Sequence, residues 1–337
     1  MKKLILLIIF SIQLAYGGRY GDAFIQTSLP AHASAMGNTA VTQLRGLSSV
    51  ISNPAGLAQV QQSSLLLQYS DVFGLASQSS IGFQYAGMDK YQLGISWFNV
   101  NVSGISSRPD ILDSLTFIER RNFLRQKGLD SWETFSNRDD AIYITLARST
   151  THNIKIGWAY DEFDIINPIG ISVKILNKSV LEESGRGIGL DFGTKFIIPG
   201  KEIFYIRKLG DFVLGLNVEN IYTTGIYWTT RHVDQVWMTF RGGIALHQPL
   251  EIIHSEVWLI WERKELINNE SVRYGIDFRM ADRVSIRLGR DFYNWNGGIG
   301  LRITLGGRDL IFDYAYQAHP LDNAHRMTFT IFPEKKR

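Results

Sequence analysis

Residues 273–279 read Arg273-Tyr274-Gly275-Ile276-Asp277-Phe278-Arg279, and their polarity alternates with a period of two. Successive side chains of a β-strand point to opposite faces of the sheet, so Tyr274, Ile276 and Phe278 share one face. The two arginines, the glycine and the aspartate share the other face. This stretch therefore predicts a strand with one apolar and one polar face.

The same alternation recurs from about Ser63 to Phe332, and its clearest repeats are residues 92–97, 187–196, 212–219, 284–289 and 298–305. A water-soluble sandwich would alternate in the same way, because one face packs on a core and the other meets water. Here, however, the polar faces are rich in Gly, Ser and Thr with isolated charges, which is typical of the inside of a membrane barrel. We therefore predict an all-β fold, a transmembrane antiparallel β-barrel.

Aromatic residues gather towards the ends of the predicted strands, for example Trp97, Trp258 and Trp261. Membrane barrels carry such aromatic girdles at both interfaces. Any one of these tryptophans could instead be an ordinary core residue. Taken together with the alternation, they favour the membrane barrel.

Counting strands back from the C-terminus and forward from residue 63 gives a barrel of about 14 strands, with residues 154–160 as a further strand-like stretch. Single-chain bacterial barrels have even strand numbers, so one assignment between residues 141 and 176 must be wrong. We expect one long strand over about residues 153–177, irregular near Asn167-Pro168, because a closed sheet tolerates proline mainly at a bulge. Residues 100–140 are predicted to form a long extracellular loop, in which residues 111–124 could form a helix that serves as a lid, docks a partner or simply rests on neighbouring loops.

The ends of the chain differ from the middle. Lys2 and Lys3, the apolar run 4–14 and the small residues of Ala15-Tyr16-Gly17 predict a cleaved signal peptide over residues 1–17. Residues 18–62 are rich in small residues with turn signals and are well placed to fold into the lumen as a plug containing short helices. The barrel then covers residues 63–332, and residues 333–337 form a short basic tail.

Composition and motifs exclude several functions. The chain has 337 residues, a formal charge of +3 and no cysteine, so neither a nucleic-acid partner nor a thiolate metal site is indicated. No nucleophile elbow, dinucleotide loop, phosphate loop or zinc-protease spacing occurs, and the seven histidines are scattered. We predict a protein that is not an enzyme and uses no cofactor or metal.

If the apolar rows face lipid, the opposite rows face the lumen. These rows contain nine basic and four acidic residues, an excess of positive charge: Lys155, Lys174, Lys195, Arg241, Arg273, Arg279, Arg287, Arg302 and Arg326 against Asp191, Glu219, Asp277 and Asp313. Such groups can pair with one another and with carbonyl groups of the plug, since a buried charge without a partner is costly. Alternatively, unpaired arginines would favour anionic head groups.

Two constellations carry a family resemblance. Residues 35–40, Ala-Met-Gly-Asn-Thr-Ala, followed by Ser52-Asn53-Pro54-Ala55-Gly56-Leu57, resemble the N-terminal signature of the PorV/PorQ family. That family consists of outer-membrane barrels related to the long-chain fatty-acid transporter FadL. Residues 313–316, Asp-Tyr-Ala-Tyr, with residues 323–326, Asn-Ala-His-Arg, resemble its last hairpin. One departure is that Phe332 is followed by a basic tail, whereas such barrels usually end on an aromatic residue.

The resemblance implies a barrel of about 14 strands in the bacterial outer membrane, closed by a plug that contains Asn53, Pro54, Ala55 and Gly56. It leaves two roles open, and a third reading is a purely structural outer-membrane protein. One is transport of hydrophobic or amphipathic small molecules, with outer-membrane lipid around the barrel and a fatty-acid-like ligand within. The other is a component of the type IX secretion system that binds or anchors exported proteins.

Overall fold

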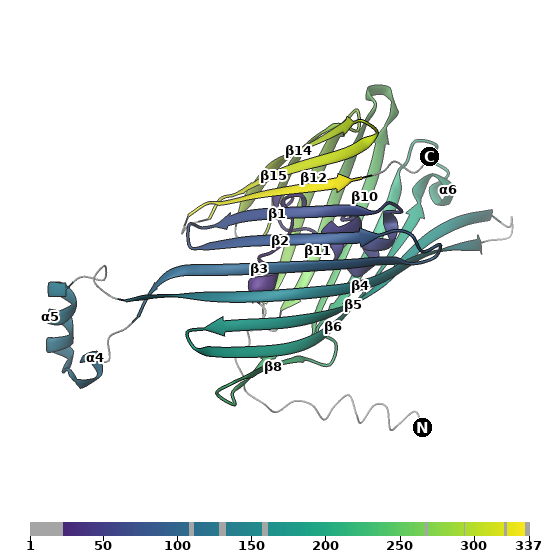
Figure 1. Ribbon diagram of the computed structural model, residues 1–337. Coiled ribbons are helices and arrows are strands. Elements are labelled where there is room, and N and C mark those ends of the chain that lie inside the picture. The colour runs from purple at the N-terminus through teal and green to yellow at the C-terminus, as the bar shows by residue number, and fades with distance from the viewer. Residues whose placement is uncertain are drawn as a thin grey trace, which may run out of the picture.

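The computed structural model describes residues 23–107, 111–127, 133–156, 161–266, 269–292, 294–319 and 322–333. Its dominant feature is one antiparallel sheet curled around a short, largely non-helical N-terminal segment (Figure 1). The strands are β1 (Ser64–Val72), β2 (Ala76–Tyr85), β3 (Gln92–Ser106), β4 (Thr134–Ile156), β5 (Asp161–Val180), β6 (Glu183–Pro199), β7 (Asp211–Glu219), β8 (Thr224–Trp228), β9 (Val233–Val236), β10 (Thr239–Leu250), β11 (Ser255–Leu266), β12 (Asn269–Met280), β13 (Val284–Arg290), β14 (Trp295–Leu305), β15 (Arg308–Gln317) and β16 (Ala324–Phe332).

The sheet closes on itself. Each strand from β1 to β6 pairs with the following strand. β7 pairs with β10, and from β10 each strand again pairs with the following one as far as β16. The two chain ends meet at a seam in which β16 pairs with β1, from Leu65 opposite Ile331 to Val72 opposite Ala324. Fourteen of the described strands therefore form the ring, which confirms the predicted closed antiparallel barrel.

The remaining two strands, β8 and β9, form a short hairpin beyond the ring, at the end of the barrel where β6 begins. β8 pairs with β6 at Gly185 to Gly187, where it continues the line of β7. The two are separated by a turn in which Asn220, Tyr222 and Thr223 all have positive φ. This hairpin thus lengthens the fourteen-strand wall at the end where β6 begins.

Side chains alternate across the wall as the sequence predicts. The apolar side chains of Ile276, Ile286 and Leu288 are exposed on the outside, whereas Asp277 and Arg287 are buried on the inside. Outward apolar rows on every side give the barrel a belt suited to lipid, since they would be unfavourable in water. Within the described residues, no helix is long and apolar enough to cross a membrane.

The aromatic prediction fails for one of the tryptophans named above. Trp261 lies on the outer face and is 42% exposed. Trp258, three residues earlier and on the opposite face, is only 5% exposed and packs inside the barrel. Trp258 is therefore an interior residue, and placing it in a girdle was wrong.

The predicted long strand over residues 153–177 is also wrong. β4 runs on to Ile156 and β5 begins at Asp161, so residues 153–156 belong to the preceding strand. The irregularity at Pro168 is present, because the β5–β6 pairing is interrupted between Ile166 and Ile169. The error arose because residues 148–153 are polar on both faces and therefore show no alternation.

The predicted loop 100–140 is shorter than expected. β3 and β4 continue to pair as far as Ser106 opposite Thr134, with an irregularity between Val102 and Ile105. The insertion between them carries α4 (Ile111–Ser114) and α5 (Phe117–Lys127), which stand clear of the barrel in Figure 1. The connection between β6 and β7 carries α6 (Gly200–Phe204), and the β10–β11 turn carries η4 (Glu251–Ile253).

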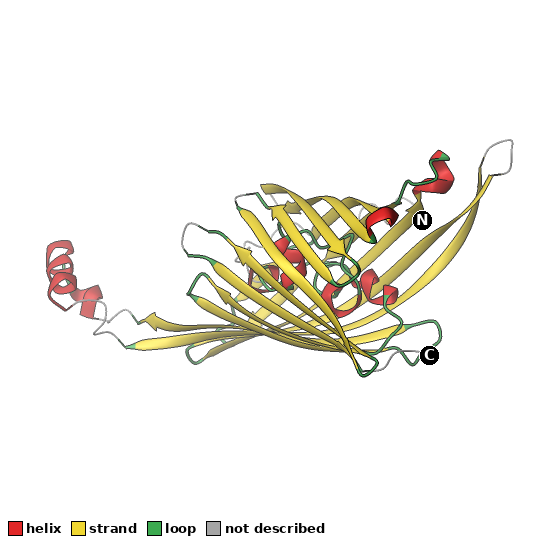
Figure 2. Ribbon diagram, turned by 90° about the horizontal axis from the view of Figure 1, so that it is seen from above, coloured by secondary structure: helices red, strands yellow, loops and turns green. Residues whose placement is uncertain are grey.

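The N-terminal segment, residues 23–62, contains α2 (Ala23–Gln26), α3 (Ala31–Ala35), η1 (Gly46–Ser49) and η2 (Pro54–Gln59). Figure 2 shows these short helices within the curve of the sheet. Ala33, Ala40, Leu44 and Leu57 are fully buried there. The predicted signal peptide and most of the basic tail lie outside the described residues.

The lipid-facing belt can be tested by placing arginine at two depths of one strand. Ile276→Arg, near the middle of the outer face of β12, should lower the free energy of unfolding by about 2–4 kcal/mol in a bilayer. Met280→Arg, at the end of the same face, should cost only about 0–1 kcal/mol. The measurement is guanidinium unfolding in lipid vesicles, followed by the fast migration of the unheated barrel on a gel. Equal losses at both depths would contradict the belt.

Candidate functional site: the barrel interior

The N-terminal segment is bound to the wall through its backbone. The carboxylate of Glu262 on β11 accepts hydrogen bonds from the main-chain N–H groups of Ala40 and Val41 at 2.7 Å and of Thr42 at 3.2 Å. Glu262 is 1% exposed. This stretch of the segment has no helix or strand to satisfy its N–H groups, so one carboxylate supplies the acceptors instead.

Basic side chains of the wall bind the carbonyl groups of the same segment. Lys195 Nζ donates to the Leu44 carbonyl at 2.5 Å and to Gln59 Oε1 at 2.9 Å. Arg273 donates to the Asn38 carbonyl at 2.9 Å, and Arg326 donates to the Thr27 carbonyl. These three of the lumen-facing charges that the sequence singled out thus hold backbone, as a buried charge requires.

The Asn-Pro-Ala-Gly stretch forms the start of η2. Asn53 Oδ1 accepts the Ala55 N–H at 3.1 Å and so caps this helix, while its amide donates to the Val41 carbonyl at 2.9 Å. Pro54 occupies the first helical position, where no N–H is needed. A Cβ on Gly56 would lie 2.5 Å from the Leu44 carbonyl oxygen, so this glycine is required for close packing.

Glycines of the wall allow the segment to approach closely. A Cβ added to Gly289 on β13 would lie 2.0 Å from the carbonyl carbon of Met36, and one added to Gly275 on β12 would lie 2.8 Å from its oxygen. Gly37 of the segment itself has a φ of +68°, and a Cβ added to it would clash with the backbone of Arg290. Backbone therefore packs directly on backbone here.

The remaining interior charges pair with one another. Lys174 lies 2.9 Å from Asp191, and Arg241 lies 2.9 Å from Glu219. Arg287 bridges Asp313 at 2.6 Å and Asp277 at 3.3 Å. All of these side chains are almost fully buried, so each charge has the nearby opposite charge that burial demands.

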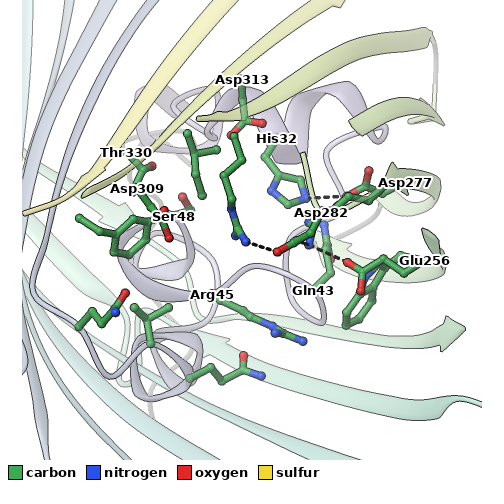
Figure 3. A pocket seen from close by; sticks show the side chains of 18 of the residues that line it. His32, Gln43, Arg45, Ser48, Glu256, Asp277, Asp282, Asp309, Asp313 and Thr330 are labelled. Carbon is green, nitrogen blue, oxygen red and sulfur yellow. Dashed lines mark hydrogen bonds and ion pairs between the residues drawn. The ribbon is translucent and has the colours of Figure 1, made fainter. Parts of the chain in front are cut away.

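A cavity of about 740 Å³ lies between the N-terminal segment and the wall, at the end of the barrel where the chain leaves β16. Figure 3 shows Arg45, His32 and Gln43 of the segment facing Glu256, Asp277 and Asp282 of the wall. Its volume falls within the range of small-molecule sites, roughly 300–1,000 Å³. Its lining is mainly polar, with Trp258, Ile311 and Phe332 as apolar contributors.

Arg45 differs from the other arginines of this cavity. Arg279 is paired with Glu256 at 2.6 Å, and Arg302 with Asp282 at 2.7 Å. The Arg45 guanidinium lies 5.4 Å from the Trp258 ring and has no hydrogen bond or ion pair to any residue that the structure describes. The Arg45 side chain is exposed to the cavity. Desolvation by the surrounding protein and the neighbouring Arg279 lower its pKa, and as an arginine it stays charged at neutral pH.

One predicted lumenal residue is elsewhere, and several interior residues escaped prediction. Lys155 is 60% exposed and pairs with Glu162 near the tip of the β4–β5 hairpin, so its lumenal placement was wrong. Glu262, Lys264, Glu256 and Arg45 were missed. The predicted excess of positive charge is too large, because Glu256, Glu262 and Asp282 add carboxylates to the interior. No group of metal-ligating side chains occurs among the described residues.

The Glu262 anchor predicts that loss of its charge loosens the segment. Glu262→Gln keeps the size of the side chain but leaves three N–H groups sharing one neutral oxygen. We expect the free energy that holds the segment on the wall to fall by about 1.5–3 kcal/mol, the usual contribution of a hydrogen bond to a charged group. It should appear as faster hydrogen exchange of residues 38–53, whereas Glu251→Gln on η4 should change nothing. Unchanged exchange in the Glu262 variant would contradict the anchor.

His32 predicts a dependence on pH. Burial, with Arg287, Arg279 and Arg45 nearby, lowers its pKa well below the ordinary value of 6.5. Unfolding therefore takes up a proton below about pH 6.5, so the stability of the docked segment is complete above that pH and falls on acidification. Hydrogen exchange of residues 30–36 should accelerate between pH 7 and pH 5, after correction for intrinsic rates, and less so in His32→Gln. An equal response in both proteins would exclude His32 as the cause.

Comparison with known proteins was informative for structure only. No protein-family model and no curated protein sequence matches the chain. The solved structure of the P. putida toluene transporter TodX is similar, with a TM-score of 0.51 and 11% identity over 90% of this chain and 96% of that one. The monoaromatic hydrocarbon channel CymD is similar too, with a TM-score of 0.50 and 11% identity over 91% of this chain and 97% of that one.

At 11% identity these matches establish the fold alone. The closed antiparallel barrel expected from the sequence is confirmed at that level. The matches do not show the PorV/PorQ family. This chain has the closed-barrel fold of the solved hydrocarbon channels TodX and CymD.

Proposed function

We propose that this protein transports hydrophobic or amphipathic small molecules across the bacterial outer membrane, with residues 23–62 acting as the plug of the barrel. The observation that carries the proposal is the cavity of about 740 Å³ between the segment and the wall, inside a barrel of the FadL-type fold. A purely structural barrel would have no need for a chamber of ligand size next to the N-terminal segment. TodX is a toluene transporter and CymD is a monoaromatic hydrocarbon channel, which supports the same class of cargo.

We place the cavity end of the barrel in the periplasm. The connection that carries α4 and α5 is at the opposite end, and bacterial barrels have their longer loops outside the cell. In this orientation the cavity is the last chamber before the periplasm. The plug separates it from the outer end, so passage requires the segment to shift, and its helices of four to six residues are short enough to move piecewise.

Arg45 gives this chamber a preference among cargoes. Its guanidinium offers unshared donors to the cavity, and Trp258 beside it offers an aromatic face. A carboxylate head group would pair with the arginine, while its apolar part lies against the tryptophan. We infer that acidic amphipathic molecules, such as fatty acids, bind here more tightly than neutral hydrocarbons.

A role in type IX secretion, as a PorV/PorQ-type barrel, is the second candidate. One feature favours it: α5 stands away from the barrel with Phe117 77% exposed and Ile118 71% exposed. Exposed apolar side chains on a projecting helix are suited to a protein partner. In this alternative the barrel would anchor the helices and the cavity would carry no cargo.

Uptake assays with two probes test the proposal. In cells that express the protein, both toluene and octanoate should enter faster than in cells without it. Arg45→Gln should lower the initial rate for octanoate by about tenfold, the effect of one charged hydrogen-bonded contact, and leave toluene unchanged. Arg207→Gln, an exposed arginine at the same end, is the matched control. Absence of protein-dependent uptake of both probes would overturn the transport proposal and favour the secretion role.

A further inference from the structure

Strands β4 and β5 continue far beyond their neighbours at the cavity end. β3 pairs with β4 only as far as Ala147, and the β5–β6 pairing ends at Ile166. β4 and β5 nevertheless pair with each other down to Ile156 opposite Asp161. The nine residues 148–156 carry β4 about 30 Å past the last residue that pairs with β3, at roughly 3.3 Å per residue. β6 still pairs with β5 opposite Arg148 and Thr151, so the ribbon is two-stranded only beyond Thr151. Figure 2 shows this ribbon as the longest projection of the sheet at that end.

The ribbon leaves the lipid belt where it leaves the barrel. The outward row of β4 carries exposed Ile144 and Leu146 within the barrel. The same row continues as Arg148, Thr150 and His152 in the ribbon, before it reaches Ile154 near the tip. Polar residues at these positions indicate an aqueous surrounding, whereas the turns at this end of a bacterial barrel are ordinarily short.

Hydrogen bonds identify which backbone groups of β4 are free. The Pro168 carbonyl accepts a bond from Thr194 Oγ1 of β6, and the Asn167 carbonyl accepts one from Thr150 Oγ1 of β4. The carbonyl group of Pro168 therefore points to β6, and that of Asn167 points to β4. Because direction alternates along a strand, Thr150 and His152 pair with β5, while Ser149, Thr151, Asn153 and Lys155 point their N–H and C=O groups to the open edge.

The middle of this edge lacks the devices that normally protect one, and Lys155 lies near the tip, where it pairs with Glu162. Proteins block exposed edges with proline, bulges or charges at the middle of the strand. Residues 149–153 read Ser-Thr-Thr-His-Asn, and every one except Thr150 is well exposed. In the described part of the chain, no third strand covers them. The edge thus has the length, the free groups and the small polar side chains that an added strand needs.

We propose that the open edge of β4, residues 149–155, binds an extended segment of a periplasmic protein as an additional β-strand. The regularly spaced main-chain donors and acceptors match extended backbone, and this mode of recognition depends on those groups more than on side chains. The proposal goes beyond transport and rests only on the orientation given above. It adds a docking site on the periplasmic side of the barrel.

A second copy of this chain does not fit the edge. Two barrels in one membrane point their ribbons the same way, so antiparallel pairing of their β4 edges would need one barrel inverted. Parallel pairing across a two-fold axis would place N–H opposite N–H and C=O opposite C=O. The occupant is therefore a different chain.

The test uses site-specific cross-linking in intact cells of the source organism. A photoreactive p-benzoylphenylalanine replaces Ser149, whose side chain is exposed and whose N–H is kept. Thr151→Pro removes one edge N–H and leaves the β4–β5 ladder, since the Thr151 N–H does not take part in it. Thr151→Ala removes the side chain and keeps the N–H. Fast migration of unheated protein verifies that both variants fold.

We expect a covalent adduct with another protein in the parent and in Thr151→Ala, and about tenfold less in Thr151→Pro. An adduct that persists in both variants, or is lost in both, would show contact through side chains and overturn the proposal. An adduct of twice the chain mass, or no adduct at all, would also overturn it. Labelling of Ser149→Cys by a bulky maleimide on intact cells would show that the ribbon lies outside the cell, and would overturn the proposal in that way. The uptake measurements test transport independently, because they do not depend on this orientation.

Discussion

Every buried backbone group inside the barrel has to find a hydrogen-bond partner, and this requirement governs the interior. A strand satisfies its own backbone through its two neighbours, so the wall makes no demand on side chains. The N-terminal segment has only short helical turns, which leave many N–H and C=O groups unpaired. Inward side chains of the wall supply the missing partners: Glu262 for the N–H groups of residues 40–42, and Lys195, Arg273 and Arg326 for carbonyl groups.

This division explains why the lumen is rich in charge without being a charged pore. Lysine and arginine that reach the segment end on a carbonyl oxygen, and those that do not are matched with carboxylates such as Asp191 and Asp313. Only around the cavity does the matching relax, because there the segment and the wall separate. The place of Arg45 follows from the path of the segment, because it is the residue that precedes η1, and its side chain makes no capping hydrogen bond.

How far the sequence predicted the molecule depended on where lipid imposes a pattern. Between residues 273 and 305 one face must be apolar and the other must not, so strand, facing and turns all followed from the alternation. In residues 148–153 both faces are polar, the pattern fades, and the strand boundary was misplaced. Glu262 and Lys264 were missed for the opposite reason, since Trp258 and Ile260 on the same inward face are apolar and hid the alternation. Arg45 had no periodic signal at all, because its position follows from tertiary packing.

The seam between β1 and β16 has a consequence for how the protein is assembled. It joins strands from the two ends of the chain, so the ring cannot be sealed until the last strand has been made. The segment that fills the ring is covalently attached to β1, one side of that seam. Its backbone packs against glycines of β12 and β13, on strands made late in synthesis. The segment must therefore enter the ring, and β1 must pair with β16, at the end of folding. Until then the incomplete sheet would expose its polar inner face and two unpaired edges to the machinery that delivers it to the membrane.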